Sequence, residues 1–361
     1  MLIGHYFITL PDSTADAVSF ERISWYLAQL GFSYLVFDYN ILPSSKFITW
    51  VISIPYSLFG RSILMAQSIS LLFGMGNVFL GWKVAKMIWD ERIANKVGWT
   101  IALFPSLVLY SVLVLREVYV AFFLLVALYG VVKWVKTNSY KSLMISIFGF
   151  IGATYFHGAM MLGGLAFLFI VFMLSIKKSY KLLLKIRISL KMIIFLSIFI
   201  FLLGYYVNSD FYIPYLGTFE DTSDISYLLR KANNATRGVA SFPEWLKIFT
   251  PVEFFYKGPV RMIYFLFSPF PWDVKQPQHL IGLIDSFLYI YLIFLIFYNR
   301  KVIFESKVLK IILLILISYI VIFSIGVGNF GTGIRHRTKF TVFFILLAAP
   351  LLKKLTFFKK E

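Results

Sequence analysis

Long apolar runs alternate with short polar stretches along most of this chain. A run of about 20 apolar residues makes a helix that crosses a hydrocarbon core about 30 Å thick. A backbone in lipid must also satisfy its own hydrogen bonds, which a helix does. The pattern predicts an all-α fold, a polytopic transmembrane helical bundle with about nine spans, over residues 62–83, 97–115, 117–134, 142–156, 159–176, 192–206, 279–298, 309–325 and 338–352.

Two further apolar segments do not fit the description of a full span. Residues 47–59 are too short to cross and contain Pro55, so we expect a re-entrant or interfacial piece there. The first ten residues end in a partial apolar segment, with no full span or signal peptide before the polar residues 11–46. We interpret this as a partial N-terminal helix and expect that a first transmembrane helix is missing from the assigned start.

The composition supports a membrane protein and excludes some chemistry. Hydrophobic residues make up 60% of the 361 positions, and the mean hydropathy is +0.81, whereas soluble domains are about half apolar. There is no cysteine and there are four scattered histidines, so neither a disulfide framework nor a zinc cluster is predicted. We predict no cofactor and no metal-ligand set, and leave assistance by a divalent metal open.

The basic residues are placed unevenly, and this indicates the orientation. If the spans alternate, the loops on one side carry 21 of the 35 Lys and Arg residues but 4 of the 17 Asp and Glu residues. An excess of Lys and Arg in short loops marks the cytoplasmic side. The net charge of +18 is therefore a topology signal, and nucleic acid is not an expected partner. The C-terminus is predicted to be cytoplasmic.

This orientation puts the residues that could do chemistry on the opposite, extracytoplasmic side. We expect one integral membrane domain over residues 1–361, with extracytoplasmic loops at 11–46 and 207–278. The aromatic residues of the second loop are typical of a segment lying along the membrane interface. The cytoplasmic loops are short and lack a Gly-rich phosphate loop, so nucleotide-sugars and ATP are not expected substrates.

The first loop offers acidic candidates. Asp12 and Asp16 lie four residues apart, at the start of an amphipathic helix expected from Ala15 onward. A carboxylate held at the membrane surface could act as a general base toward a sugar hydroxyl. The alternative is structural, because acidic residues at a helix start cap it and complement its dipole. Glu21 is a third candidate, which could equally be an exposed helix residue.

Two short turns between spans add further candidates on the same side. Arg116 could face a phosphate, since its planar guanidinium matches phosphate oxygens, or it could form an interfacial ion pair with Glu117. His157 lies in a turn beside Gly158. A lone histidine at a turn is more often structural than catalytic. His157 is a candidate only because it is predicted to lie on the same side as the other groups.

The stretch GNFGTGIRHRTKF, residues 328–340, packs four basic groups between apolar runs: Arg335, His336, Arg337 and Lys339. Its glycines permit close backbone approach. Exposed amides and arginines together suit a phosphate, or the pyrophosphate of a lipid carrier. The alternative is binding of lipid headgroup phosphates without catalysis. In both cases the ligand is an anion at the extracytoplasmic surface.

Four stretches together resemble a bacterial polytopic glycosyltransferase of the GT-C superfamily: PDSTADAVSFERISWYLAQ, YSLFGRSILMAQSISLLFG, ALFPSLVLYSVLVLREVYVAFFLLVALYG and GNFGTGIRHRTKF. The resemblance runs through most of residues 10–350. It implies a multi-pass inner (plasma) membrane enzyme that transfers a sugar from a polyprenyl-phosphate donor to a glycan or lipid-linked acceptor in cell-surface polysaccharide synthesis. It further implies Asp16 or Asp12 as the base, with Arg116, Arg335 and Arg337 near the donor phosphate.

Other functions fit the same pattern. Polysaccharide polymerases of the O-antigen type are similar in composition and topology. A transporter or lipid flippase would place ionisable groups near the bilayer midplane, whereas the predicted spans have few charges in their middles. A scaffold subunit of a polysaccharide assembly complex would leave the outer aspartates dispensable.

Overall fold

The computed structural model describes residues 6, 10–41, 45–183, 233, 240–276 and 279–353. Across these ranges the secondary structure is helical, apart from one isolated antiparallel bridge between Ser241 and Asn329. The all-α prediction is confirmed for this part of the chain. The predicted span 192–206, most of the loop 207–278 before residue 240, and the first residues of the chain lie outside the described residues.

The helices follow one another with short connections. The first half of the described chain contains α2 (Ala15–Ala28), η1 (Tyr34–Asp38), α3 (Ser45–Phe59), α4 (Ile63–Ile88), α5 (Glu91–Leu103), α6 (Pro105–Ser111), α7 (Glu117–Thr137), α8 (Tyr140–Phe156), η2 (Gly158–Met160) and α9 (Met161–Leu183). The second half contains η3 (Glu244–Leu246), α13 (Pro251–Phe267), η4 (Pro271–Asp273), α14 (His279–Tyr298), α15 (Arg300–Glu305), α16 (Lys307–Gly326), α17 (Phe330–Thr338), α18 (Thr341–Ala348) and η5 (Ala349–Leu351).

Several helices are long and apolar enough to cross a membrane. Four of the described helices meet this criterion alone, namely α4, α7, α14 and α16, and a fifth span is possible if the bent pair of α5 and α6 crosses as one. The prediction of nine spans is therefore not confirmed. The segment 47–59 lies in α3, an apolar helix that is shorter than a full span. Its re-entrant or interfacial placement stays a prediction.

The predicted spans differ from the structure for identifiable reasons. The run 97–115 is bent by 60° at Phe104, because Pro105 lacks a backbone donor and disfavours helical geometry in the residue before it. The run 338–352 holds only the short α18 and η5, which contains Pro350. Run length alone does not reveal such breaks.

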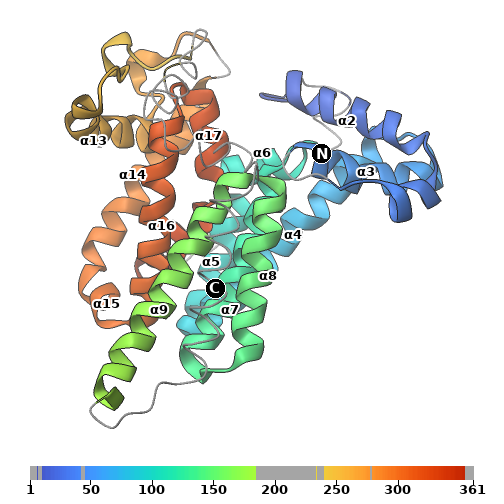
Figure 1. Cartoon of the computed structure of the whole chain (residues 1–361). Coiled ribbons are helices and arrows are strands. Elements are labelled where there is room, and N and C mark those ends of the chain that lie inside the picture. Colours follow the sequence, from blue (N-terminus) through green and yellow to red (C-terminus); the bar gives the residue numbers. More distant parts are fainter. Residues whose placement is uncertain are drawn as a thin grey trace, which may run out of the picture.

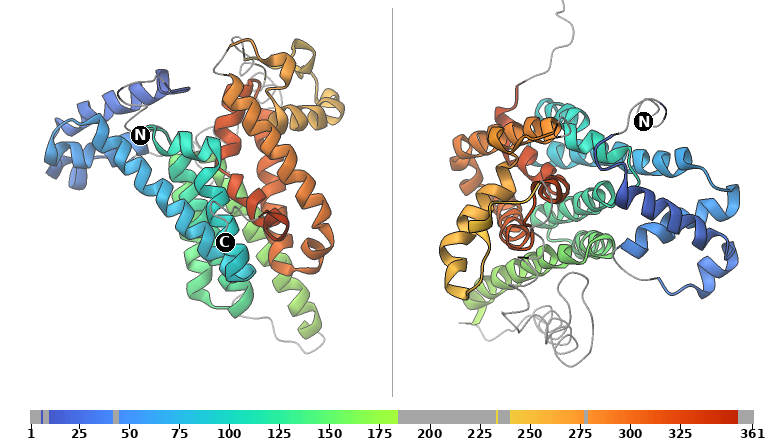
Figure 2. Two further views of the ribbon diagram at one scale, coloured as in Figure 1. Left: turned by 180° about the vertical axis from the view of Figure 1, so that it is seen from behind. Right: turned by 90° about the horizontal axis from the view of Figure 1, so that it is seen from above.

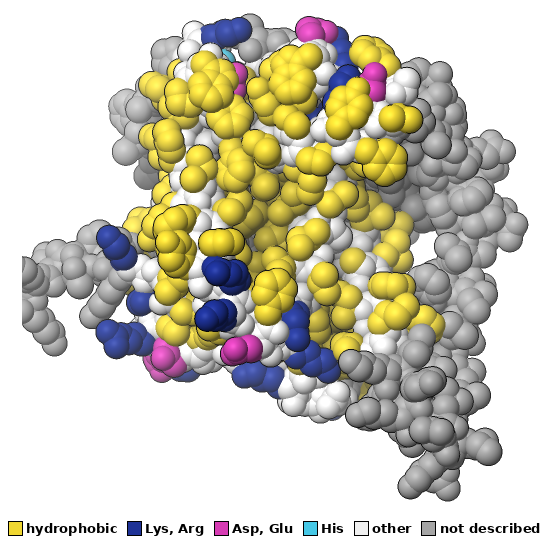
Figure 3. All heavy atoms as spheres, turned by 90° about the vertical axis from the view of Figure 1, so that its left-hand side faces the viewer, with side chains coloured by type: hydrophobic (Ala, Val, Ile, Leu, Met, Phe, Trp, Pro, Cys, Tyr) yellow, Lys and Arg dark blue, Asp and Glu magenta, His cyan; other side chains and the backbone are white. Residues whose placement is uncertain are grey.

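The long helices stand side by side, and other helices lie across one end of the bundle (Figures 1 and 2). At that end α13 and the arm formed by α2 and α3 run across the direction of the bundle, beside α6 and α17. The loop between α7 and α8, and the helix α15, lie at the opposite end. A wide hydrophobic band separates the two ends, with Lys and Arg gathered at the lower one (Figure 3).

Small residues allow the closest helix packing in the bundle. A Cβ atom added to Gly149 would come within 2.3 Å of the backbone nitrogen of Ala127, and one added to Gly130 within 2.4 Å of that of Ser146. Helices in membranes pack through such small residues, because lipid supplies no hydrophobic drive toward association. The α7 and α8 helices therefore pack tightly, and the candidate residues Arg116, Glu117 and His157 lie at one end of this hairpin.

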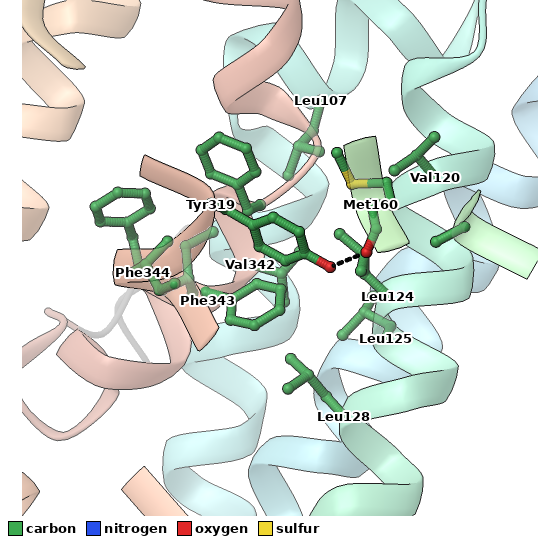
Figure 4. Close-up of a cluster of buried hydrophobic side chains, with 14 of the residues drawn as sticks. Leu107, Val120, Leu124, Leu125, Leu128, Met160, Tyr319, Val342, Phe343 and Phe344 are labelled. Atoms are coloured by element: carbon green, nitrogen blue, oxygen red, sulfur yellow. Dashed lines mark hydrogen bonds between the residues drawn. The ribbon is translucent and has the colours of Figure 1, made fainter. Parts of the chain in front are cut away.

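A core of buried hydrophobic side chains lies between the two ends of the bundle. The Tyr319 hydroxyl donates to the Met160 carbonyl oxygen at 3.0 Å, and its ring lies among leucines of α7 and phenylalanines of α18 (Figure 4). Gly163 gives space for that ring, since a Cβ atom there would approach the Tyr319 ring to 2.1 Å. The buried Tyr319 thus ties α16 to the turn before α9, just below the polar groups.

Candidate functional site

The short helix α17 presents the basic stretch in two directions. Its start is fixed by the Asn329 side chain, which accepts a hydrogen bond from the Thr332 amide at 3.2 Å, and by the Phe330 amide, which donates to the Ala240 carbonyl oxygen at 2.9 Å. Residues two apart on a helix point about 200° away from each other. Arg335 and Arg337 therefore leave α17 on opposite sides.

Arg335 links α2 to α7. Its Nη1 lies 2.7 Å from Asp16 Oδ2, and its Nε lies 3.4 Å from Glu117 Oε1. These three residues come from α17, α2 and α7. The Asp16 side chain is 52% exposed, whereas that of Glu117 is 1% exposed. The ion pair with Asp16 therefore faces open space, and the one with Glu117 is enclosed by protein.

A buried layer of titratable groups lies next to this arginine. Lys339 Nζ is 3.7 Å from Glu117 Oε1 and 2.6 Å from His336 Nδ1. The ring centroids of His336 and His157 are 5.1 Å apart, and His157 is also buried. A charged lysine can only donate to His336 Nδ1, so that nitrogen must then carry no proton. Burial, followed by the nearby charges of Lys339 and Arg335, lowers the pKa of His336 well below its usual value.

Asp12 lies close to the same cluster by a different contact. The Tyr110 hydroxyl donates to Asp12 Oδ2 at 2.7 Å, and Asp12 has a left-handed backbone conformation with φ of 58°, which Asp tolerates better than most residues. Asp12 is exposed as a residue, but its carboxyl contacts the buried Tyr110. Desolvation there, aided by the charges of Glu117 and Asp16, raises the pKa of Asp12 despite the Tyr110 hydrogen bond and the positive charge of Arg335.

Arg116 lies at the same end, between α6 and α7. It is 6% exposed, and its guanidinium lies over the Phe20 ring of α2 at 5.6 Å. Glu117, the next residue, is turned to Arg335 and Lys339 instead. Both residues are thus enclosed by protein rather than forming a solvated pair at a turn.

Arg337 is separate from this cluster. Its guanidinium is fully buried and donates to the Leu266 and Ser268 carbonyl oxygens at 2.8 Å each and to the Ser286 hydroxyl at 2.9 Å. Its Nε lies 3.4 Å from Asp285 Oδ2 in α14, and Asp285 is fully buried too. Arg337 therefore acts as a brace between α13, α14 and α17, away from the other residues that were predicted to bind the donor phosphate.

Glu21 also lies apart from the cluster. It accepts two hydrogen bonds from Arg61, at 2.9 and 2.8 Å, and a third from the Tyr56 hydroxyl at 3.1 Å. These bonds hold α2 against α3 and the start of α4. The Arg61 contacts, with the hydrogen bond from Tyr56, lower the pKa of Glu21 despite partial burial. Its role is to fix the arm that carries the two aspartates.

The cluster thus gathers eight predicted residues at one end of the bundle: Asp12, Asp16, Arg116, Glu117, His157, Arg335, His336 and Lys339. We refer to them as the polar cluster. Sequence reasoning missed Tyr110, which is hidden in an apolar run, and Asp285. A lone carboxylate within the run 279–298 was a detectable signal, because charged groups inside apolar spans are costly and rarely incidental.

Three comparisons with known proteins give no relative for this chain. No family model, no curated protein and no solved structure matches it. Among the residues that the structure describes, no three His, Cys, Asp or Glu side chains are grouped so that they could hold a metal ion.

Proposed function

We propose that the protein transfers a sugar from a polyprenyl-phosphate carrier to a hydroxyl of a glycan or lipid-linked acceptor, at the extracytoplasmic face of the membrane. The observation that carries the proposal is the 2.7 Å ion pair between Asp16 and Arg335, beside Asp12. This pair brings carboxylates and a cation that could bind a phosphate together from distant parts of the chain, at one end of an apolar bundle. Such a transfer requires both kinds of group.

In the proposed reaction, the acceptor oxygen forms a bond to the anomeric carbon as the bond from that carbon to the phosphate oxygen breaks. The hydroxyl proton passes to a carboxylate, and the electron pair of the broken bond leaves with the polyprenyl phosphate. Direct displacement inverts the anomeric configuration. The leaving group is already a phosphate, so no nucleotide is needed.

The different surroundings of the two aspartates favour Asp12 as the base. Its raised pKa makes it a better proton acceptor than an ordinary aspartate, and its carboxyl is oriented by Tyr110. The Asp16 carboxylate instead forms an ion pair with the Arg335 guanidinium. An incoming donor phosphate would replace Asp16 at this guanidinium, since both present oxygens to the same nitrogen atoms. Arg116 and Lys339 would add positive charge behind it.

The test uses purified protein in proteoliposomes with a panel of polyprenyl-phosphate hexoses, and measures release of polyprenyl phosphate. Asp12→Asn should lower the turnover rate by about 10²–10⁴-fold, the usual contribution of a general base. Asp16→Asn should mainly change the apparent KM for the donor. Glu244→Gln, an exposed residue at the same end, is the matched control. Turnover that survives both aspartate variants would refute the proposal.

The same variants can be tested in cells. In a strain that lacks the gene, Asp12→Asn should fail to restore the surface glycan although the protein reaches the membrane. An O-antigen or exopolysaccharide polymerase would use the same cluster and would differ in its acceptor. Chain length of the product then separates a single transfer from polymerisation.

One observation favours a second candidate, a polysaccharide or lipid transporter. Transporters place broken helices and ionisable groups at membrane depth, and here the α5–α6 pair is bent by 60° while Asp285 and Arg337 are fully buried nearby. Both charges are paired with protein groups, which is typical of a brace. A transporter would move a labelled lipid-linked glycan across proteoliposomes without releasing polyprenyl phosphate.

A further inference from the structure

The helix α13 carries an apolar face that no other described element covers. Val252, Phe255, Tyr256 and Ile263 are 69, 81, 60 and 48% exposed, and their spacing of three, four and seven or eight residues puts them on one side of the helix. Phe249, Trp245 and Trp272, which flank α13, are 66, 57 and 71% exposed. Large aromatic side chains in such a contiguous patch mark an interaction surface.

The rotation of α13 about its axis is fixed by its opposite side. Arg261, which is 1% exposed, donates to the Ile325 and Val327 carbonyl oxygens at 2.9 Å each and to the Ser324 carbonyl oxygen at 3.2 Å. These carbonyls lie at the C-terminal end of α16. The apolar face therefore points outward as part of the fold.

The depth of α13 is fixed by its contact with a span. A Cβ atom added to Gly282, in the first turn of α14, would lie 3.2 Å from the Pro269 side chain just after α13. The end of α13 is thus level with the point where α14 begins. Viewed from above, α13 lies along one side of the bundle (Figure 2), and aromatic side chains at this end continue the hydrophobic band (Figure 3).

The charges around the patch are balanced. Lys257 Nζ is 2.9 Å from Glu253, and Lys247 Nζ is 2.5 Å from Glu244. Both lysines therefore already have carboxylate partners and leave little positive charge for anionic headgroups. Attraction to this surface depends on apolar and aromatic contact, as in interfacial helices.

We infer that α13 is an interfacial anchor whose apolar face inserts into the lipid leaflet at the polar-cluster end of the bundle, without a requirement for anionic lipid. The occupant is lipid rather than a partner protein, because the face is continuous with the band that the spans present to the bilayer. This inference does not depend on the reaction proposed above.

The chain contains no cysteine, so single spin labels can be introduced directly. Labels at positions 252 and 255 report on the face, a label at position 287, on the exposed side of α14, is the membrane reference, and one at position 244 is the water reference. In phosphatidylcholine nanodiscs we expect the ratio of oxygen to nickel-chelate collision rates at 252 and 255 to be several-fold above that at 244. The values should approach that at 287.

Three results would overturn the inference. Ratios at 252 and 255 equal to that at 244 would place the face in water, and labels shielded from both reagents would indicate a protein contact, such as a second copy. Replacing part of the lipid by phosphatidylglycerol should leave the ratios unchanged. If insertion occurs only with the anionic lipid, the lysines rather than the apolar face carry the binding.

Discussion

Arg335 and Arg337 are two residues apart in the sequence and have opposite surroundings. Arg335 bonds to Asp16, which is half exposed and could be displaced by an anion. Arg337 is enclosed: its Nη1 and Nη2 groups donate to carbonyl oxygens and a hydroxyl, and it forms a buried ion pair with Asp285. A basic residue in a conspicuous motif therefore binds a ligand or braces the fold according to the side of the helix from which it leaves.

The largest effect is expected when the brace is broken. Arg337→Met leaves Asp285 buried without its cation, and removal of one partner of a buried ion pair costs about 3–5 kcal/mol. The unfolding midpoint of the detergent-purified protein in a denaturant titration measures this loss. The double variant with Asp285→Leu should recover part of the lost stability. Recovery should be incomplete, because the carbonyl oxygens that accept hydrogen bonds from Arg337 lose these bonds.

Arg335→Gln should separate activity from stability. Removing one preorganised donor at a developing charge lowers turnover by about 10²–10³-fold. The half-exposed pair with Asp16 contributes about 0–1 kcal/mol to stability, and buried Glu117 keeps Lys339 as a partner when Arg335 is replaced, so the loss of stability should be smaller than in Arg337→Met. Release of polyprenyl phosphate and the unfolding midpoint are measured on the same preparation. If Arg335→Gln unfolds the protein as readily as Arg337→Met does, the two arginines do not differ in the way proposed.

The side of α17 that faces the polar cluster should also make stability depend on pH. The lowered pKa of His336 means that the folded chain binds fewer protons than the unfolded chain below about pH 6.5. Stability should therefore fall as the pH falls through that value, by up to about 1.4 kcal/mol per pH unit for each such histidine. His157 shifts in the same direction.

The control for this pH dependence is a pair of variants measured at several pH values. His336→Gln should make the decline below about pH 6.5 shallower. Glu244→Gln, a substitution at an exposed side chain outside the polar cluster, should keep the slope of the wild-type protein. An unchanged slope in His336→Gln would place the titrating group elsewhere.

The smallest effect is expected for Asp16→Asn on stability. Its side chain is 52% exposed, and a pair in that environment contributes at most about 1 kcal/mol. A change in the unfolding midpoint larger than this would mean that Asp16 holds the arm formed by α2 and α3 in place. Asp16 would then be a structural residue rather than a displaceable partner of Arg335.

The sequence predicted most of the residues that the structure brings together, but not the contacts between them. Sidedness brought Asp12, Asp16, Arg116, Glu117, His157, Arg335, His336 and Lys339 onto one candidate list, and the structure places all eight at one end. The sequence did not show that Arg337 differs from Arg335, or that Glu21 lies apart from the polar cluster. Both differences depend on partners distant in the sequence, which are Asp285 for Arg337 and Arg61 for Glu21.

The spans show a similar limit. Apolar run length identified the segments that hold α4, α7, α14 and α16, but it did not show where a run is bent or where it holds buried polar groups. Phe104 and Pro105 bend one run. Lys339 and Thr341 lie in another, where they are buried by protein rather than lipid. Hydropathy reflects how favourably a residue moves from water into apolar surroundings. It does not tell whether lipid or protein forms those surroundings.

The sequence by itself determined that the chain is helical with helices apolar enough to span a membrane, because apolar length acts locally and every segment carries it. Only the tertiary structure decided which carboxylate meets which cation. Asp16 and Arg335 are 319 positions apart, and their contact depends on how α2, α7 and α17 pack together. A distance of that kind is a property of the folded chain and cannot be read from any one stretch of it.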